Sequence, residues 1–310
     1  MIIRIENLVK RYKNVLAVDH FNMEVREGEV LGLLGPNGSG KTTTINCMLS
    51  LLRYDKGSIQ VFGQEMKPSS YKLKRDIGVV MQNVAVFDEL TVYENIDYFC
   101  GLYVTNSAAR KKLVDEAIQF VALQDFVTFR PKKLSGGLVR RLNIACGIAH
   151  KPKLIILDEP TVAVDPQSRD YILQGIKELN RQGATIIYTS HYMEEVEQIC
   201  SRVVIIDKGQ NIADGTPDEL KRMIKTGETI RISVLGLERA HVDKISAMPN
   251  VFAVDYADDT LVVRCEQGAN NLADVLSYLG KHEIAFGRVL SELPTLNDVF
   301  LEMTGKDLRD

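Results

Sequence analysis

The sequence predicts an α/β domain built on a largely parallel sheet, followed by a smaller α+β domain. Residues 1 to about 220 alternate apolar runs with segments of helical periodicity, the rhythm of parallel strands connected by helices. Residues 225–310 follow a different order of strands and helices. The polar stretch from Asp218 to Glu228 is therefore the expected boundary between a first domain, 1–220, and a second, 225–310.

Four apolar runs are expected to be buried strands of the parallel sheet. They are rich in Leu, Ile and Val without polar alternation, as in strands covered on both faces. Residues 105–150 lack such runs and instead contain two segments with amphipathic helical periodicity. We therefore expect a mostly helical insert at about residues 83–150. The expected strands are 30–34, 154–157, 185–188 and 203–206, and the expected helices of the insert are 108–122 and 136–149.

The second domain has the element order of a ferredoxin-like fold, which is βαββαβ. Pro294-Thr295 then marks the start of a last short helix. Acidic residues outnumber basic ones in this domain, which disfavours a role in holding phosphate or nucleic acid. The expected elements are strand 229–234, helix 238–248, strands 251–256 and 260–265, helix 271–280 and strand 284–290.

Composition excludes several classes of function. The net charge of −3 and the pI of about 6.0 lack the basic excess of nucleic-acid binders, so no nucleic-acid partner is expected. No run approaches the length of a membrane span, and the start does not resemble a signal peptide. The chain is thus expected in the cytoplasm. The five cysteines are widely spaced and read as reduced core thiols rather than a disulfide or zinc framework: Cys47, Cys100, Cys146, Cys200 and Cys265.

The strongest chemical signal is a complete phosphate-binding loop between a buried strand and a helix predicted from about Lys41 to Leu51. Its glycines let successive backbone N–H groups face phosphate oxygens, and the helix N-terminus adds its positive end. We expect Lys41 to reach the β- and γ-phosphates and the Thr42 hydroxyl to ligate Mg²⁺. A glycine-rich turn without a ligand is the alternative, which the full pattern disfavours. The candidate residues are Gly35, Pro36, Asn37, Gly38, Ser39, Gly40, Lys41, Thr42 and Thr43.

A second signal is the apolar strand from Leu154 that ends in Asp158-Glu159-Pro160. Asp158 is expected to hold Mg²⁺ through water, because hard cations prefer oxygen ligands. Glu159 is expected to orient or deprotonate the attacking water. Acidic residues after a strand often only cap a helix. Together with the phosphate-binding loop, they indicate a site that hydrolyses a nucleoside triphosphate.

Further motifs follow in an order that resembles the ATP-binding cassette (ABC) ATPases over residues 1 to about 220. The resemblance implies the cofactors ATP and Mg²⁺, catalytic roles for Glu159, His191 and Gln82, and a metal role for Gln82. Taken alone, each added residue has a plainer interpretation as packing, a turn or a helix cap. The motifs are Leu134-Ser135-Gly136-Gly137 (signature), Gln82 (Q-loop), His191 (switch histidine), Val164-Asp165 (D-loop) and Tyr12 (adenine stacking).

The resemblance also implies partners. In the family, Ser135 and Gly137 contact the γ-phosphate of ATP held by the opposite subunit, so one chain must pair with a second copy of itself. Separation after hydrolysis drives a separate integral membrane permease, which selects the substrate. The chain is then peripheral on the inner face of the cell membrane. We expect the permease to contact residues 83–105, including Asp88 and Glu89.

Two departures bear on the subgroup. Leu138 follows the signature where Gln is commoner, and Ala163 replaces the usual Gly of the D-loop. An apolar residue after the signature and the pair Arg140-Arg141 resemble the drug-exporter subgroup. The segment 293–301 resembles the tail of daunorubicin-type exporter ATPases, and it also reads as an amphipathic helix that covers the small domain.

An exporter ATPase is the first hypothesis, and three alternatives stay open. An importer ATPase with a ligand-sensing ferredoxin-like tail is disfavoured by Leu138 and the tail motif. A soluble ABC ATPase of translation or DNA repair typically carries two cassettes or long coiled coils, which this chain lacks. A catalytically inactive ATP-binding regulator is disfavoured by the presence of Lys41, Glu159 and His191.

Overall fold

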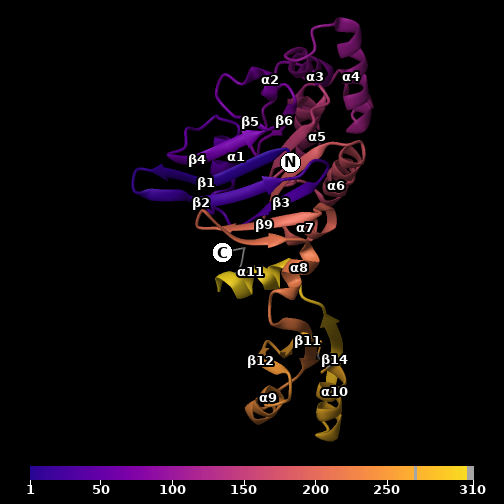
Figure 1. The fold of residues 1–310 in the computed structure, drawn as a ribbon. Coiled ribbons are helices and arrows are strands. Elements are labelled where there is room, and N and C mark those ends of the chain that lie inside the picture. The colour runs from indigo at the N-terminus through magenta and orange to yellow at the C-terminus, as the bar shows by residue number, and fades with distance from the viewer. Residues whose placement is uncertain (269–270, 306–310) are drawn as a thin grey trace. The chain divides into compact units, whose positions relative to one another are not determined.

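The computed structural model describes residues 1–268 and 271–305 and divides into two compact units. The first comprises Met1–Thr216 and the second begins at Pro217, so the stretch expected as a boundary, 218–228, lies in the second unit. Figure 1 shows the elements of both units. Residues 306–310, which the expected second domain includes, lie outside the described residues.

A six-stranded sheet forms the centre of the first unit, in the order β10-β9-β3-β8-β7-β6. Neighbouring strands from β9 to β6 are parallel, and β10 pairs with β9 in the antiparallel sense. Every residue of β3, β7 and β8 is buried, which confirms the strands predicted from the uninterrupted apolar runs. The bounds are β3 Val30–Leu34, β6 Ile77–Val80, β7 Leu154–Asp158, β8 Thr185–Ser190, β9 Arg202–Asp207 and β10 Gln210–Gly215.

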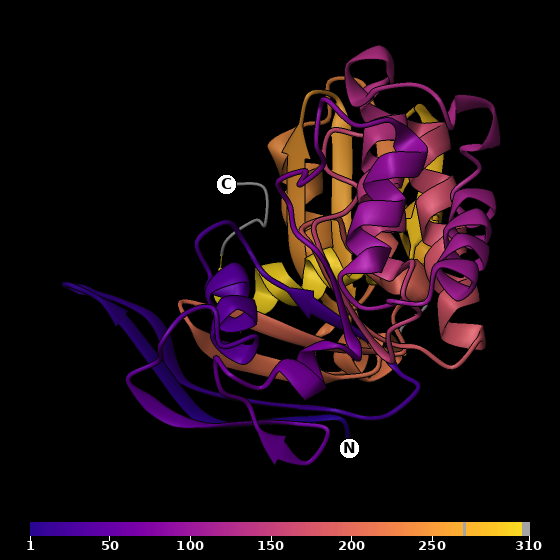
Figure 2. The same cartoon turned by 90° about the horizontal axis from the view of Figure 1, so that it is seen from above.

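A second, antiparallel sheet was not predicted. Its order is β2-β1-β4-β5, and the long β1–β2 hairpin projects from the rest of the unit in Figure 2. One apolar cluster joins this sheet to helix α1 and the central sheet, and it includes Phe21, Ile45, Ile59, Ile156 and Ile187. The bounds are β1 Ile3–Tyr12, β2 Val15–Val25, α1 Lys41–Met48, β4 Lys56–Val61 and β5 Gln64–Glu65.

The segment between β6 and β7 is helical. Polar side chains begin its helices: Thr91 forms a capping box with Glu94, and Asn106 and Ser135 cap α4 and α5. Figure 1 shows these helices grouped on one side of the central sheet. The bounds are α3 Val92–Gly101, α4 Ser107–Phe120, η1 Gln124–Phe126, η2 Pro131–Lys133 and α5 Gly136–Ile148; elsewhere in the unit lie α2 Tyr71–Lys74, α6 Pro166–Arg181 and α7 Met193–Ile199.

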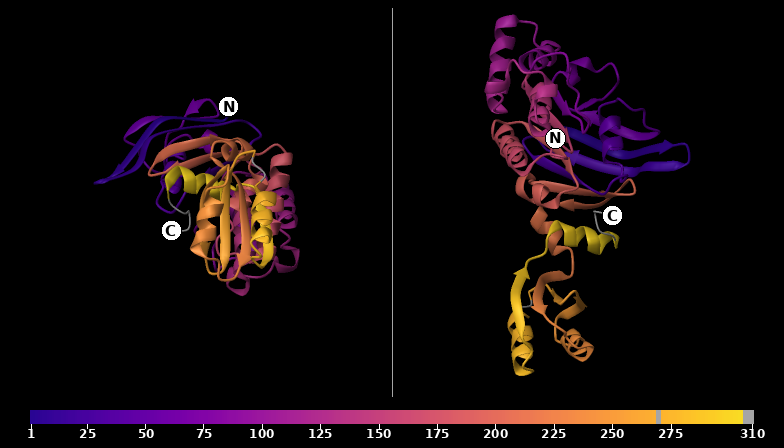
Figure 3. Two further views of the ribbon diagram at one scale, coloured as in Figure 1. Left: turned by 90° about the horizontal axis from the view of Figure 1, so that it is seen from below. Right: turned by 180° about the vertical axis from the view of Figure 1, so that it is seen from behind.

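The second unit contains an antiparallel sheet in the order β12-β13-β11-β14. Alternate residues of β11 and β13 pack with α9 and α10 in one apolar cluster, and Figure 3 shows these elements from two further sides. The βαββαβ order confirms the expected ferredoxin-like fold. The bounds are α8 Pro217–Arg222, β11 Thr226–Val234, α9 Arg239–Ser246, β12 Val251–Ala257, β13 Thr260–Glu266, α10 Leu272–Lys281, β14 Phe286–Glu292 and α11 Leu296–Thr304.

The expected last helix is α11. Thr295 begins it with a capping box in which Asp298 is the reciprocal partner. Leu296, Val299 and Phe300 form its buried face. Glu302 accepts a hydrogen bond of 2.7 Å from the backbone N–H of Lys225, so the helix is fastened to the start of β11.

Two further observations concern the cysteines and the helices that could span a membrane. All five cysteines are buried and free, and burial raises the pKa of Cys47 to about 11, as expected for core thiols. Among residues 1–268 and 271–305, no helix has the length and apolarity needed to cross a bilayer.

The cluster between the two sheets of the first unit gives a test of the fold. Ile187→Ala on β8 removes a fully buried side chain, and we expect the free energy of unfolding to fall by about 2–5 kcal/mol. Leu51→Ala is the control, because Leu51 is 65% exposed and should change stability by less than about 0.5 kcal/mol. Urea denaturation followed by circular dichroism measures both; equal effects of the two variants would contradict the assigned core.

Candidate functional site

The loop 35–42 connects β3 to α1, as predicted. Gly40 stands at the N-cap of α1 with a φ of 110° and provides no side-chain cap, so the N–H groups of the first turn are left for another acceptor. A Cβ on Gly40 would lie 2.6 Å from the carbonyl oxygen of Ala17. Glycine is therefore required here by backbone conformation and by space. An uncapped helix N-terminus next to such a loop is suited to an anion.

Lys41 folds back over this loop. Its Nζ donates to the carbonyl oxygens of Gly35 at 2.7 Å and Pro36 at 3.2 Å, and the side chain is only 5% exposed. Nζ also lies 3.6 Å from Glu159 Oε1. Burial lowers the pKa of Lys41, and the carboxylates of Glu159 and Asp158 oppose this shift. The loop thus holds a cation beside two acidic groups.

Asp158 ends β7 and binds two hydroxyls. Thr42 Oγ1 donates to its Oδ2 at 3.0 Å, and Thr189 Oγ1 donates to its Oδ1 at 2.6 Å. Asp158 is 1% exposed, whereas Thr42 is exposed. A carboxylate and a hydroxyl this close together form the start of an oxygen ligand set, which fits Mg²⁺.

Glu159 is the point at which the predicted motifs meet. Its Oε2 accepts a hydrogen bond from Gln82 Nε2 at 3.3 Å and lies 3.5 Å from His191 Nδ1. Its φ is 48°, a conformation that costs free energy for a residue with a side chain and is often found at functional sites. The His191 Nδ1 atom is buried and makes no hydrogen bond among the described residues, so Glu159 is its nearest charged neighbour.

Arg140 is part of this site, although in the sequence analysis it indicated only a resemblance to the drug-exporter subgroup. Its side chain is 5% exposed and donates to the carbonyl oxygens of Met81 at 3.1 Å and Glu159 at 3.4 Å. Arg140 shares one face of α5 with the buried residues Gly137 and Ile144. That periodicity was the signal that could have identified Arg140 as buried.

The signature residues form a second group. Ser135 caps α5 by accepting from the N–H of Leu138 at 3.3 Å, and Asp165 caps α6 by accepting from the N–H of Ser168 at 2.9 Å. A Cβ on Gly137 would lie 2.4 Å from Ser168 Oγ and 2.7 Å from Asp165 Oδ2. The glycine therefore allows the two helix starts to meet. Ser135, Gly136 and Asp165 are exposed.

The structure does not join this second group to the first. Among residues 1–268 and 271–305, no hydrogen bond or ion pair of Ser135 or Asp165 reaches Lys41 or Glu159. Tyr12 is also separate: it ends β1, is 45% exposed and has the Lys10 ammonium 5.3 Å from its ring centroid. Its ring is free to stack on a planar ligand.

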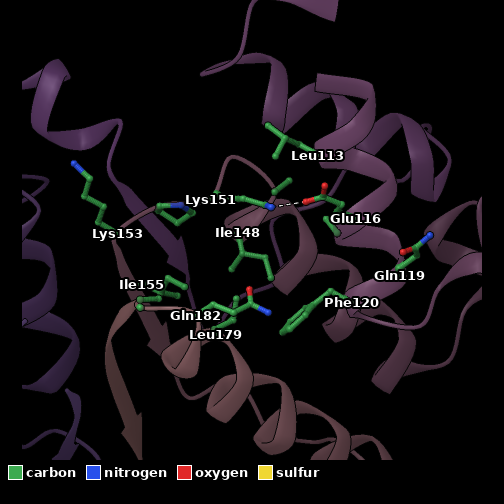
Figure 4. A pocket seen from close by; sticks show the side chains of 15 residues that line it. Leu113, Glu116, Gln119, Phe120, Ile148, Lys151, Lys153, Ile155, Leu179 and Gln182 are labelled. Carbon is green, nitrogen blue, oxygen red and sulfur yellow. Dashed lines mark ion pairs between the residues drawn. The ribbon is translucent and has the colours of Figure 1, made fainter. Parts of the chain in front are cut away.

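A cavity of about 610 Å³ lies elsewhere in the first unit, between α4, the end of α5 and the end of α6 (Figure 4). Apolar side chains such as Leu113, Phe120 and Leu179 line it, and Glu116 pairs with Lys151 at its edge. None of the predicted site residues contributes to this cavity. It is therefore distinct from the candidate site.

Comparison with known proteins identifies the family. The family described as ABC transporter matches residues 18–162, and the family described as ATP-binding protein DrrA1-3-like, C-terminal domain, matches residues 215–304. The linearmycin resistance ATP-binding protein LnrL of Bacillus subtilis is 37% identical over 307 residues, which cover 98% of this chain and 99% of that protein. This chain belongs to the ABC transporter ATP-binding family.

Other relatives of this ABC protein have export or resistance names. The daunorubicin resistance ATP-binding protein DrrA3 of Streptomyces coeruleorubidus is 32% identical, with 99% of this chain and 97% of that protein covered. The Nod factor export ATP-binding protein I of Ralstonia nicotianae is 32% identical, with 100% of this chain and 95% of that protein covered. The match to the DrrA-like C-terminal family confirms the resemblance of the tail to daunorubicin-type exporter ATPases.

Solved structures agree with this membership. An ATP-binding subunit of an ABC transporter is 25% identical with a TM-score of 0.66, covering 72% of this chain and 93% of that one. The cassette MJ0796, described as a dimer in a post-hydrolysis state bound to ADP and Pi, is 26% identical with a TM-score of 0.64, covering 69% of this chain and 98% of that one. The chain is thus an ATP-binding subunit of an ABC transporter, with the ABC ATPase fold.

The geometry of Gly40 gives a test of this ABC site. In Gly40→Ala, the added Cβ meets the Ala17 carbonyl and the left-handed backbone is strained, so the loop must move; we expect the Kd for ATP to rise at least about tenfold. Gly28→Ala is the control, since Gly28 also has a positive φ of 76° but open space around its Cβ. Equilibrium dialysis with labelled ATP measures both, and unchanged binding by Gly40→Ala would contradict the loop assignment.

Proposed function

We propose that this chain is the ATP-hydrolysing motor of an exporter, which dimerises with ATP at the interface and drives a separately encoded permease. The observation that carries the proposal is the meeting of Lys41, Gln82 and His191 at the Glu159 carboxylate. These residues come from different segments, and each has a charge or hydrogen-bonding group suited to phosphoryl transfer.

Each residue then has a distinct task. The loop N–H groups and Lys41 hold the phosphates, and Tyr12 stacks on adenine. Thr42 and Asp158, with Gln82 at the edge, would hold Mg²⁺, which when bound neutralises charge on the phosphates. Glu159 accepts a proton from the attacking water, oriented by the Gln82 amide. His191 donates a hydrogen bond toward the γ-phosphate through a ring nitrogen.

Dimerisation is supported by the exposed second group. The exposed residues of this group are Ser135, Gly136 and Asp165, which lie at the starts of α5 and α6. Among the described residues, no hydrogen bond or ion pair joins them to Lys41 of the same subunit. A second copy related by two-fold symmetry would place this group over the partner's phosphate-binding loop and close two sites at once. The structural relative MJ0796 is described as a dimer, which supports the same arrangement here.

Export is supported by relatives named for drug resistance and Nod factor export. The permease contact is proposed at residues 83–105, where Val84, Phe87, Tyr98 and Leu102 are exposed apolar side chains. The rings of Phe87 and Tyr98 pack edge to face with centroids 5.0 Å apart. Exposed aromatic clusters of this kind favour binding to another protein. The chain would then be peripheral on the cytoplasmic face of the membrane.

The catalytic role of Glu159 is tested by Glu159→Gln. The amide keeps the shape of the side chain but cannot accept the proton, so we expect the ATP turnover of the purified chain to fall at least about a hundredfold while ATP-dependent dimers accumulate. Steady-state phosphate release and size-exclusion chromatography with ATP measure the two effects. Glu27→Gln, at an exposed position, is the control. Turnover that survives in Glu159→Gln would assign the proton acceptor to another residue.

The proposed permease contact at residues 83–105 is tested by reversing the charge of an acidic residue within it. Glu89 is exposed, and Glu89→Lys should lower the fraction of the chain retained on washed native membranes by at least about threefold, because rim charges guide docking. Glu27→Lys, a reversal outside residues 83–105, should leave the retained fraction unchanged. Quantitative immunoblotting of membrane pellets provides the measurement. Equal retention of both variants would move the contact away from this segment.

A further inference from the structure

A further buried carboxylate, besides Asp158 and Glu159, lies outside the predicted motifs. Glu195 on α7 is 3% exposed. Its Oε2 accepts hydrogen bonds from the hydroxyls of Tyr188 at 2.6 Å, Thr161 at 2.8 Å and Ser190 at 3.0 Å. Three O–H donors thus converge on one oxygen of a buried side chain, which holds Tyr188, Thr161 and Ser190 together.

A cation faces the other carboxylate oxygen. Arg169 Nε on α6 lies 3.3 Å from Glu195 Oε1, within ion-pair range, although neither atom makes a hydrogen bond among the described residues. The Arg169 guanidinium also lies over the Tyr192 ring, 4.9 Å from its centroid. A buried carboxylate is stable only with such compensation. Glu195 thus connects α7 to α6, to β8 and to the segment after β7.

Glu195 contacts Ser190 and Arg169 contacts Tyr192, so the residues on both sides of His191 are held. Ser190 Oγ donates to Glu195 and accepts from the Tyr192 N–H at 2.9 Å, so the backbone is tied to the carboxylate on both sides of the histidine. The rings of His191 and Tyr192 are 4.2 Å apart, and Tyr192 also contacts Arg169. The place of the His191 ring therefore depends on Glu195 and its partners.

Another contact reaches the segment that follows Glu159. Thr161, two residues after Glu159, is fully buried and donates its hydroxyl to Glu195. The other end of this short stretch is held by β8, because the Glu159 N–H donates to Thr189 Oγ1 at 2.9 Å. Glu195 thus binds the chain beyond Glu159 as well as the chain around His191.

We propose that Glu195 is a positioning residue for ATP hydrolysis: its carboxylate sets the distance between Glu159 and His191 through Thr161 on one side and Ser190 on the other. The inference rests on the proposed function, because it assumes that Glu159 and His191 act together in hydrolysis. Glu195 touches neither the phosphate-binding loop nor Asp158 in the described structure. Its effect should therefore fall on turnover rather than on nucleotide binding.

The kinetic test compares Glu195→Gln with Glu194→Gln. Glu195→Gln keeps the side-chain shape, but its three hydroxyl partners then meet a neutral oxygen and its NH₂ group faces Arg169. Glu194→Gln is the control, because it makes the same change at the exposed neighbouring residue. We expect kcat of Glu195→Gln to fall about tenfold to a hundredfold, as small misplacements of reacting groups do. The KM for MgATP should change by less than about threefold, and Glu194→Gln should match the native protein in both parameters.

Two outcomes would overturn the proposal. The first is a kcat of Glu195→Gln within about twofold of native; the second is a loss of kcat accompanied by an equal loss of MgADP affinity, as a merely structural role would give. Should Glu195→Gln fail to fold, Thr161→Val removes a single hydroxyl donor at nearly constant volume and must show the same selective loss of kcat.

The position of His191 can also be measured without turnover. In protein labelled with ¹³C-histidine, the ring resonance of His191, assigned with His191→Gln, should shift in Glu195→Gln and stay in place in Glu194→Gln. An unmoved resonance would overturn the proposal. This result is independent of hydrolysis, so a native protein that hydrolyses no ATP would count against the proposed function and not against the positioning role.

Discussion

The site depends on one buried carboxylate, Glu159, held beside the Lys41 ammonium. Removing both charges from water costs several kcal/mol per ion. The attraction between Lys41 Nζ and Glu159 Oε1, which lie 3.6 Å apart, offsets part of this cost. The Gln82 amide and the Arg140 guanidinium supply further hydrogen bonds to the side chain and the backbone of Glu159. A residue so strongly dependent on its partners fixes the relative positions of the segments that carry them.

Strand order supplies those segments. The order β3-β8-β7-β6 places the carboxyl ends of four parallel strands next to one another, where α/β folds bind their ligands. The phosphate-binding loop follows β3, His191 follows β8, Glu159 follows β7 and Gln82 follows β6. The register pairs Asp158 with Thr189 across β7 and β8, which explains why the Thr189 hydroxyl binds Asp158. The strand order of the central sheet therefore determines which site residues lie next to one another.

The sequence predicted the elements with a strong periodic or motif signal. The buried strands, the phosphate-binding loop and the ferredoxin-like order were evident because uninterrupted apolar runs and glycine spacing are local. The antiparallel sheet was missed because the β1–β2 pairing contains several register shifts, which disturb the alternation expected of a half-buried strand. Arg140 and Glu195 were missed because a charged residue in a helix is usually solvated, and only their tertiary partners make burial stable.

The stretch from Glu159 to Asp165 links the two groups of site residues, and its backbone is unusually constrained. Glu159 and Ala163 both have positive φ values, 48° and 57°, which cost roughly 1–2 kcal/mol each for residues with a side chain. Alanine at position 163, where the family usually has glycine, has fewer alternative conformations than glycine would have. Thr161 is fixed between them by Glu195. The backbone that joins Glu159 to Asp165 therefore has little conformational freedom, because two strained residues and one buried hydrogen bond lie along it.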